Sequence, residues 1–161
     1  VVAGGNEHRV VAETFGADVS HISIVASDLD TSVLATAEKA VYPIERVEKL
    51  SPERLRKFFL RGTGSQEGFV SVRPELKRMI TFQRLNLLDA SYAVKGPLDV
   101  IFCRNVMIYF DKPTQYKILS RFAPIMQPDG LMFAGHSESF LHAADLFKSQ
   151  GKTVYALANA R

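Results

Sequence analysis

Polar side chains follow two apolar runs of the sequence, at positions where they could bind a ligand. Asp28 comes just after the run 22–26, and Arg104 and Asn105 follow the run 98–102. A carboxylate can accept hydrogen bonds from both hydroxyls of a ribose, and ligands of open α/β sheets bind outside the carboxyl ends of the strands. We therefore interpret Asp28, Arg104 and Asn105 as candidate binding residues. A structural salt bridge is the alternative role for Arg104.

Two further polar clusters stand before or after apolar segments. The segment 85–89 places Asn86 between apolar residues in front of a loop, and its alternative interpretation is an ordinary turn. In 135–139, His136 stands next to Ser137, which suggests a nucleophile. The Gly-x-Ser-x-Gly elbow that would present such a serine does not surround it, so we expect Ser137 to cap a short helix instead.

The histidines and the cysteine do not form a metal-binding pattern. The spacing of His8, His21, His136 and His142 is not that of metal ligands, so we expect no metal site. Cys103 lies inside an apolar run and is the only cysteine, so it cannot form an internal disulfide. We interpret it as a buried packing thiol in a protein of the reducing cytosol.

Alternating strands and helices are expected to position these side chains. Short apolar runs rich in β-branched and aromatic residues predict buried strands at 22–26, 98–102 and 130–134, with a last edge strand at 153–157. Apolar residues at helical spacing predict helices at 32–40 and 113–126. Asp30 and Asp111 can cap these helices, and Pro113 suits a first helical turn. The order predicts an α/β fold with a parallel sheet.

The stretch 41–85 interrupts this alternation. A helix is predicted to begin at the cap Ser51-Pro52-Glu53. The glycine-containing turn 61–68 and the alternating run 69–73 follow it and predict a small β-hairpin. We therefore expect one domain over 1–161, with an inserted helix and antiparallel β-subdomain at about 44–84.

Composition limits the class of protein. The chain has 161 residues and 17.9 kDa, 47% hydrophobic and 23% charged residues, which is typical of one globular domain. A net charge of +3 is too small to indicate nucleic-acid binding, although a pI of about 9.1 suits an acidic partner. We recognise neither a signal peptide nor an apolar run of the roughly 20 residues that cross a bilayer. We expect a cytoplasmic monomer that does not insert into membranes.

The order of these motifs resembles the chemotaxis receptor methyltransferases, the CheR-type protein-glutamate O-methyltransferases. The resemblance covers nearly everything from 22 to 157. It rests on ASDLD at 26–30, FFLRGTG at 58–64, LNLL at 85–88, IFCRNVMIYFD at 101–111, PDG at 128–130 and GHSE at 135–138.

The resemblance implies a class I, Rossmann-like domain that binds S-adenosylmethionine. Asp28 would hold the adenosine ribose, Asn86 and Leu87 would flank the adenine, and Arg104, Asn105 and Val106 would line the methionine side of the pocket. Tyr109 would face the reacting centre as a catalytic residue, and Arg104 could anchor a carboxylate of the cofactor or of the substrate.

The resemblance also implies partners and a second surface. The substrate would be glutamate side chains on the cytoplasmic helices of a chemoreceptor. Arg61, Gly62, Gly64 and Arg73 would bind the receptor's C-terminal tail peptide, which would add to the hairpin as a strand. A bulky residue at Gly64 should then block docking.

Two features depart from the family pattern. The family's glycine motif is replaced by GGNEHRV at 4–10, where Glu7 would contact the cofactor. The family also carries an N-terminal helical domain, and we expect this chain to lack it. The leading hypothesis is methyl transfer from S-adenosylmethionine to receptor glutamates. The alternatives are a receptor-tail binding module whose glycine loop no longer holds the cofactor and, without G-x-G-x-x-G, a nicotinamide-dependent oxidoreductase.

Overall fold

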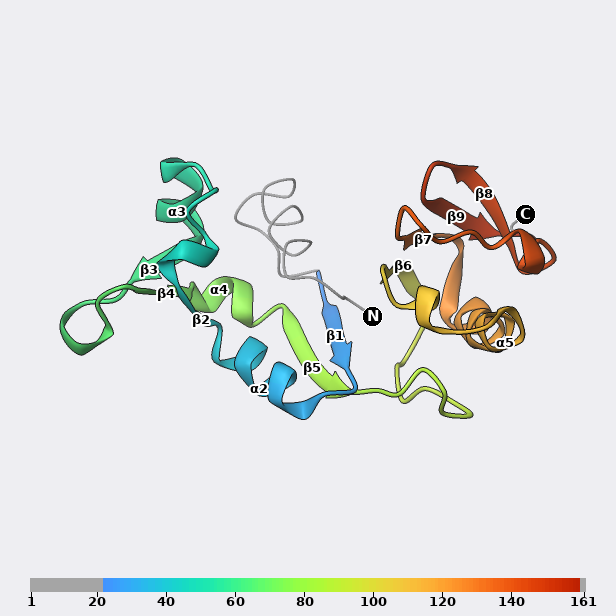
Figure 1. The fold of residues 1–161 in the computed structure, drawn as a ribbon, viewed down its shortest axis with the longest axis horizontal. Coiled ribbons are helices and arrows are strands. Elements are labelled where there is room, and N and C mark those ends of the chain that lie inside the picture. Colours follow the sequence, from blue (N-terminus) through green and yellow to red (C-terminus); the bar gives the residue numbers. More distant parts are fainter. Residues whose placement is uncertain (1–21, 160–161) are drawn as a thin grey trace. The chain divides into compact units, whose positions relative to one another are not determined.

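The computed structural model describes residues 22–159, drawn in colour in Figure 1. These residues form two compact units. We call residues 27–29 with 85–159 the C-terminal unit, and residues 22–26 with 30–84 the N-terminal unit. Each unit is described by itself. Among the described residues, no helix has the length and apolarity that a membrane crossing requires.

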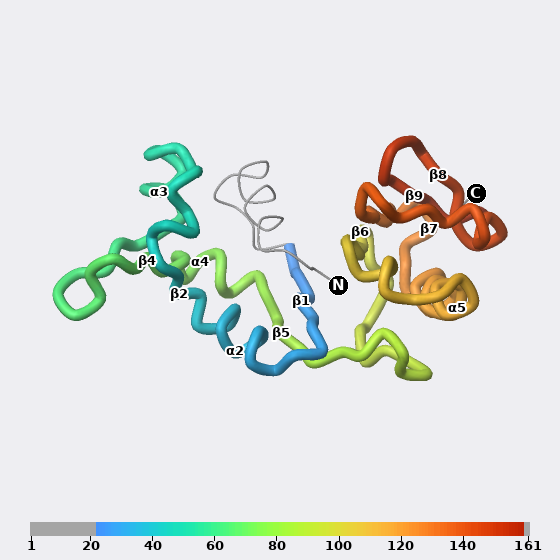
Figure 2. The backbone as a smooth tube through the Cα atoms, in the orientation of Figure 1, coloured from blue at the N-terminus to red at the C-terminus, as the bar shows by residue number. Residues whose placement is uncertain are grey.

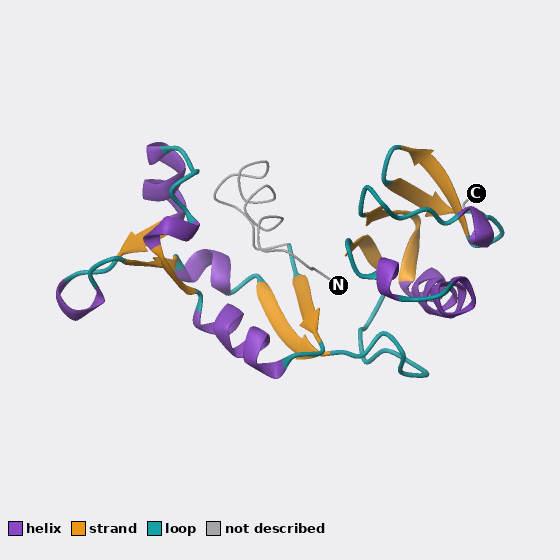
Figure 3. Ribbon diagram, in the orientation of Figure 1, coloured by secondary structure: helices purple, strands orange, loops and turns teal. Residues whose placement is uncertain are grey.

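A four-stranded sheet forms the centre of the C-terminal unit (Figure 3). Its order is β6-β7-β9-β8, built from β6 Leu98–Cys103, β7 Met126–Ala134, β9 Val154–Leu157 and β8 Phe147–Gly151. The strands β6 and β7 run parallel, as the apolar runs predicted, whereas β9 is antiparallel to both β7 and β8. The prediction of an edge strand at 153–157 is wrong, because β8 pairs with the outer side of β9.

Helix α5, Lys112–Phe122, contributes the other half of this core. Asp111 accepts a hydrogen bond from the backbone N–H of Thr114 at 2.9 Å, which confirms the predicted N-cap, and a proline lies in the first turn. The short helix η4, Ala123–Ile125, continues α5. The helix buries Ile118, Leu119 and Phe122 in one cluster with side chains of β6 and β7.

Strands β1, Ile24–Asp28, and β5, Ile80–Arg84, form a pair in the N-terminal unit. The last two residues of β1, Ser27 and Asp28, are assigned to the C-terminal unit. Between these strands in sequence comes α2, Thr31–Lys39. Its predicted cap is confirmed, because Asp30 accepts a hydrogen bond from the backbone N–H of Ser32 at 2.7 Å. A hydrogen bond from the Ser32 hydroxyl, and secondarily this backbone bond, lower the pKa of Asp30.

A small antiparallel sheet of order β2-β4-β3 completes the N-terminal unit, and Figure 2 traces the backbone through its strands β2 and β4. It consists of β2 Val41–Pro43, β4 Phe69–Val72 and β3 Phe59–Arg61, and the turn between β3 and β4 carries η2, Gly64–Gln66. The hairpin was predicted and β2 was not. Helix α3, Pro52–Phe58, begins after Ser51, whose hydroxyl accepts from the N–H of Arg54 at 3.3 Å. The short helices η1, Ile44–Arg46, and α4, Pro74–Lys77, flank the sheet's strands in sequence.

Cys103 ends β6 inside the core, as the apolar run predicted, with no exposed surface. Burial, and secondarily the charge of Glu138, raises the pKa of its thiol from 9.0 to about 12. Since only the thiolate reacts, we expect the folded chain to be inert to a thiol-specific reagent at about pH 8.5, where about a quarter of an exposed thiol with a pKa of 9.0 is ionised. The thiolate fraction should be about a thousandfold smaller than that of the unfolded chain.

Release of the reagent's chromophore, followed with and without urea, measures this difference. Urea should release one equivalent, because the chain has a single cysteine. Rapid labelling of the folded chain would contradict the buried position of Cys103.

Candidate functional site

One buried carboxylate joins two loops at the edge of the main sheet. Glu138 is only 8% exposed. Its Oε1 accepts hydrogen bonds from the backbone N–H groups of Val106 at 3.0 Å and Met107 at 2.8 Å. Its Oε2 accepts from the N–H groups of Asn105, at 3.2 Å, and Gly135. A single side chain therefore satisfies four main-chain donors from two separate segments.

Strand pairing brings those two segments together. Cys103 at the end of β6 lies opposite Ala134 at the end of β7, and the strands are parallel, so both carboxyl ends meet at one edge. Residues 104–106 leave β6 and lead into η3, Met107–Tyr109. Residues 135–138 leave β7 in a turn in which the N–H of Glu138 donates to the carbonyl of Gly135 at 3.1 Å. This edge is where open α/β sheets bind ligands.

A buried amide fixes the far side of the same loop. Gln115 of α5 is 6% exposed, and its Nε2 donates to the carbonyls of Met107 and Phe110, both at 2.9 Å. The Lys112 ammonium donates to the Gln115 side-chain oxygen and to the carbonyl of Ser139, both at 3.3 Å. Glu138 thus holds the donors of the loop after β6, and Gln115 holds its acceptors.

Three predicted cofactor residues lie on this loop. Arg104 and Val106 are half-buried, and Asn105 between them is exposed. Asn105 has a φ of 58°, in the left-handed region, which asparagine tolerates better than most residues. The loop therefore presents the Asn105 side chain outward while its main chain is held by Glu138.

Tyr109 ends η3 and is 79% exposed. This aromatic residue is therefore not part of the core. An exposed hydroxyl two residues beyond Met107, which is fully buried, is available to a substrate, and its catalytic role stays a prediction.

Asp28 and the segment after β5 are also held together. The main-chain carbonyl of Asp28 accepts a hydrogen bond from the N–H of Leu85 at 3.0 Å. The Asn86 side-chain oxygen accepts from the N–H of Leu88 at 3.0 Å, so the turn that was the alternative for 85–89 is present. Leu87 is buried in the core, and hence any contact of this residue with an adenine would come from its main chain.

The remaining candidates have simpler positions. His136 and Ser137 are exposed in the turn after β7, and the expected helix capped by Ser137 is not formed, because the turn leads to the buried Glu138. Glu7 and the segment 4–10 lie outside the described residues. Within residues 22–159, no three His, Cys, Asp or Glu side chains are grouped to hold a metal ion.

Glu138 and Gln115 are the site residues that sequence reasoning missed. Glu138 was noticed only as the last residue of the GHSE motif, and Gln115 was not singled out within its predicted helix. An acid three residues after a glycine at the end of a strand is a signal that could have pointed to Glu138. Its four donors, however, include three that lie more than 30 residues away in sequence.

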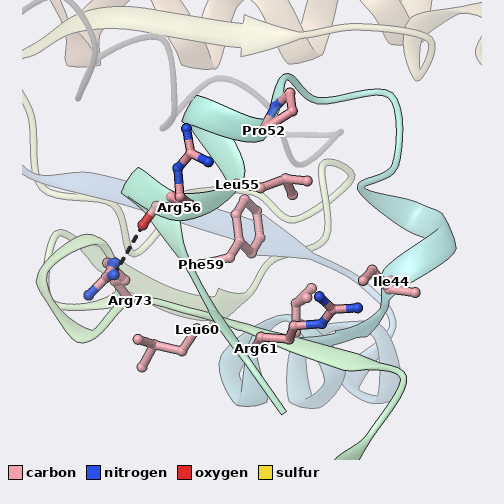
Figure 4. Close-up of a pocket in the computed structure, with 9 residues that line it drawn as sticks. Ile44, Pro52, Leu55, Arg56, Phe59, Leu60, Arg61 and Arg73 are labelled. Atoms are coloured by element: carbon pink, nitrogen blue, oxygen red, sulfur yellow. Dashed lines mark hydrogen bonds between the residues drawn. The ribbon is translucent and has the colours of Figure 1, made fainter.

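A groove of about 540 Å³ lies in the N-terminal unit, between α3 and the small sheet (Figure 4). Two of the predicted peptide-binding residues, Arg61 and Arg73, line it, and Gly62 and Gly64 belong to the adjoining turn. The other lining residues are mostly apolar: Ile44, Pro52, Leu55, Arg56, Phe59, Leu60 and Val70. The groove combines an apolar floor with cations.

The charged side chains of the C-terminal unit suit S-adenosylmethionine. This cofactor carries a ribose diol at one end and an amino-acid carboxylate at the other. The C-terminal unit offers a half-buried carboxylate, Asp28, for the diol and a half-buried cation, Arg104, for the carboxylate. The chemistry of these residues fits the cofactor that the motifs imply.

Comparison with known proteins supports this assignment. Residues 9–156 match the family model described as CheR methyltransferase, SAM binding domain. The chain is 51% identical to the chemotaxis protein methyltransferase of Escherichia coli and 49% identical to chemotaxis protein methyltransferase 2 of Pseudomonas aeruginosa, each over 92% of its length. It spans about half the length of these relatives, 52% and 53%.

Among solved structures, a glycopeptide N-methyltransferase complexed with sinefungin is similar over 93% of this chain and 57% of its own chain. The sequence identity is 14% and the TM-score is 0.46. That likeness is too low to support an argument. The mixture of helices and sheets and the match over 9–156 agree with an α/β class I methyltransferase fold. The chain belongs to the CheR methyltransferase family, of which it represents the SAM-binding domain.

Proposed function

We propose that the chain binds S-adenosylmethionine and directs its methyl group to glutamate side chains of chemotaxis receptors, forming methyl esters. The proposal rests on the edge formed by β6 and β7, where a buried carboxylate holds the Arg104–Val106 loop. It also rests on the membership of the chain in the CheR family. A cytoplasmic, monomeric protein would suit the cytoplasmic helices of such a receptor.

The proposed methyl transfer does not require a general base. S-Adenosylmethionine supplies an activated methyl group on a sulfonium. A substrate glutamate has a pKa of about 4.3 and is already ionised at neutral pH, so no general base is needed. The site must instead align the carboxylate oxygen with the methyl carbon and exclude water. In this proposal Asp28 accepts the ribose hydroxyls, Arg104 pairs with a carboxylate, and Tyr109 orients the attacking oxygen.

Replacement of Asp28 by alanine should weaken binding of S-adenosylhomocysteine while the fold persists. Two ribose hydroxyls would lose a charged acceptor, a loss of about 1.5–3 kcal/mol or roughly 10- to 150-fold in affinity. Isothermal titration calorimetry of parent and Asp28→Ala measures the change.

Asp99→Ala is the matched control, because Asp99 is exposed near the opposite end of β6. Equal affinities of parent and Asp28→Ala would remove Asp28 from the site. A parent that binds no S-adenosylhomocysteine would instead favour the second candidate, a receptor-binding module that no longer holds the cofactor.

Replacement of Tyr109 by phenylalanine should lower the methylation rate more than cofactor affinity. Its hydroxyl, on a side chain that is 79% exposed, would act on the reacting oxygen mainly in the transition state. The rate should fall about 10- to 100-fold, the loss expected when one hydrogen bond to a charged group is removed from the transition state.

Radiolabelled methyl transfer to a receptor fragment measures the rate, and calorimetry measures the affinity. Because the chain spans half of its relatives, the assay uses it both alone and joined to the part of the Escherichia coli relative that it does not cover. An unchanged rate in an active chimera would show that Tyr109 is not catalytic.

The groove of the N-terminal unit supports docking of a receptor tail. The strand β3 is an edge of the small sheet, and its main chain can accept an added strand. Arg61 and Arg73 can meet acidic side chains, and Phe59 can contact an aromatic one. Arg73 donates from Nη2 to the carbonyl of Arg56 at 3.0 Å (Figure 4), whereas its buried Nε has no acceptor within residues 22–159.

The backbone conformation of the turn beside the groove makes Gly64 a poor position for a test substitution. Gly64 has a φ of +59°, and nothing lies within 4 Å of where its Cβ would be. Valine there would be strained by the left-handed backbone, so Gly64→Val would disturb the turn whether or not a peptide docks against it. Arg61, which is exposed, is the cleaner position to test.

Arg61→Ala should weaken binding of an acidic, aromatic-containing receptor tail peptide about fivefold or more, because a charge pair with the tail is lost. Fluorescence anisotropy with the labelled peptide measures the affinity, with Arg78→Ala as control, since Arg78 is exposed and lies outside the groove lining. S-Adenosylhomocysteine affinity should not change. Equal peptide binding by both variants, or no binding by the parent, would exclude docking in this groove.

A further inference from the structure

We infer that Glu138 is a positioning residue of the S-adenosylmethionine pocket, whose buried carboxylate sets the main chain of residues 105–107 and thereby places Arg104 and Asn105 at the methionine end of the cofactor. The inference rests on the proposed function. It assigns a role to a residue that would itself not touch the cofactor.

The number of acceptor sites explains why this residue is a carboxylate. Four N–H groups converge on its two oxygens, two on each. An ionised carboxylate offers about four lone-pair sites and no donor, so it can satisfy all of them with charge-assisted bonds. A glutamine of the same size would offer one oxygen and would turn an NH₂ group toward at least some of the N–H donors.

The contacts of Glu138 distinguish it from an ordinary ion pair. Among the described residues, its hydrogen bonds come from main-chain N–H groups and none comes from a lysine or arginine. Three of the donors are consecutive, Asn105, Val106 and Met107, and such a run of aligned N–H groups forms a cradle for an anion. The carboxylate therefore organises a loop rather than neutralising a neighbouring charge.

The opposite loop carries a glycine where a side chain would clash. A Cβ on Gly135 would lie 2.5 Å from the side-chain oxygen of Asn105 and 2.8 Å from Oε2 of Glu138. Gly135 therefore lets the two loops approach, and Asn105, whose side-chain oxygen lies beside Gly135, has a left-handed backbone. The strained residue, the glycine and the buried carboxylate are parts of one assembly next to Arg104.

The test compares Glu138→Gln with Glu75→Gln, which makes the same chemical change at an exposed site. Two ligands are titrated by calorimetry. S-Adenosylhomocysteine has a methionine-derived end, and adenosine has only the base and the ribose, of which the proposed function assigns the ribose to Asp28. Amide hydrogen exchange of the ligand-free chain follows the N–H groups of residues 105, 106, 107 and 135.

Glu138→Gln should weaken S-adenosylhomocysteine binding about tenfold or more, the ratio that loss of a hydrogen bond to a charged group produces. Adenosine affinity should stay within about twofold of the parent, since Glu138 acts on the methionine end alone. Exchange at residues 105–107 and 135 should accelerate, while Glu75→Gln behaves like the parent. If Glu138→Gln does not fold, Glu138→Asp, which keeps the charge on a shorter side chain, is measured against the same expectations.

Two outcomes would overturn the inference. Equal losses for both ligands would mean that Glu138 serves general stability only, and an unchanged affinity for S-adenosylhomocysteine would mean that the loop does not need it. A parent chain that fails to bind S-adenosylhomocysteine is a different result, because it overturns the proposed function on which the inference rests.

Discussion

The candidate site depends on the way in which two parallel strands end beside each other. When β6 and β7 stop at Cys103 and Ala134, the sheet no longer satisfies the N–H groups of the residues that follow. Burying those donors without acceptors would cost about 1–3 kcal/mol each, which is a large fraction of a domain's total stability. The carboxylate of Glu138 satisfies four of them at once and so makes a buried, ordered turn possible where ligands bind.

The same requirement explains why polar groups occur in an otherwise apolar core. Ile118, Leu119 and Phe122 of α5 pack against the sheet, yet Gln115 on the same helix is also buried. Its amide satisfies two carbonyls of the loop whose N–H groups Glu138 satisfies. Fully satisfied buried networks of this kind restrict a segment to one conformation, which a binding loop needs in order to be organised before its ligand arrives.

Local patterns predicted the elements whose formation is decided locally. Apolar β-branched runs indicated β6 and the end of β7, and Asp30 and Asp111 indicated two helix starts that the structure confirms. The strand β8 escaped prediction because four of its five residues are exposed, so it has no apolar run. Glu138 escaped because its role depends on residues that are close in space only after β6 and β7 have paired. Family motifs indicated Asn86 and Leu87 as cofactor residues, and the structure adds that the first also forms a turn and the second belongs to the core.

The two proposed binding activities fall in different compact units of the chain. The edge of β6 and β7 belongs to the C-terminal unit, and the groove lined by Arg61 and Arg73 belongs to the N-terminal unit. The hydrogen bonds that shape each of them come from residues of the same unit. Single substitutions at sites without shared partners usually have additive effects, so a variant of the groove should leave the cofactor edge intact. Under the proposed function, a receptor tail and a methyl donor would therefore bind to one polypeptide through two interactions that different units of the chain encode.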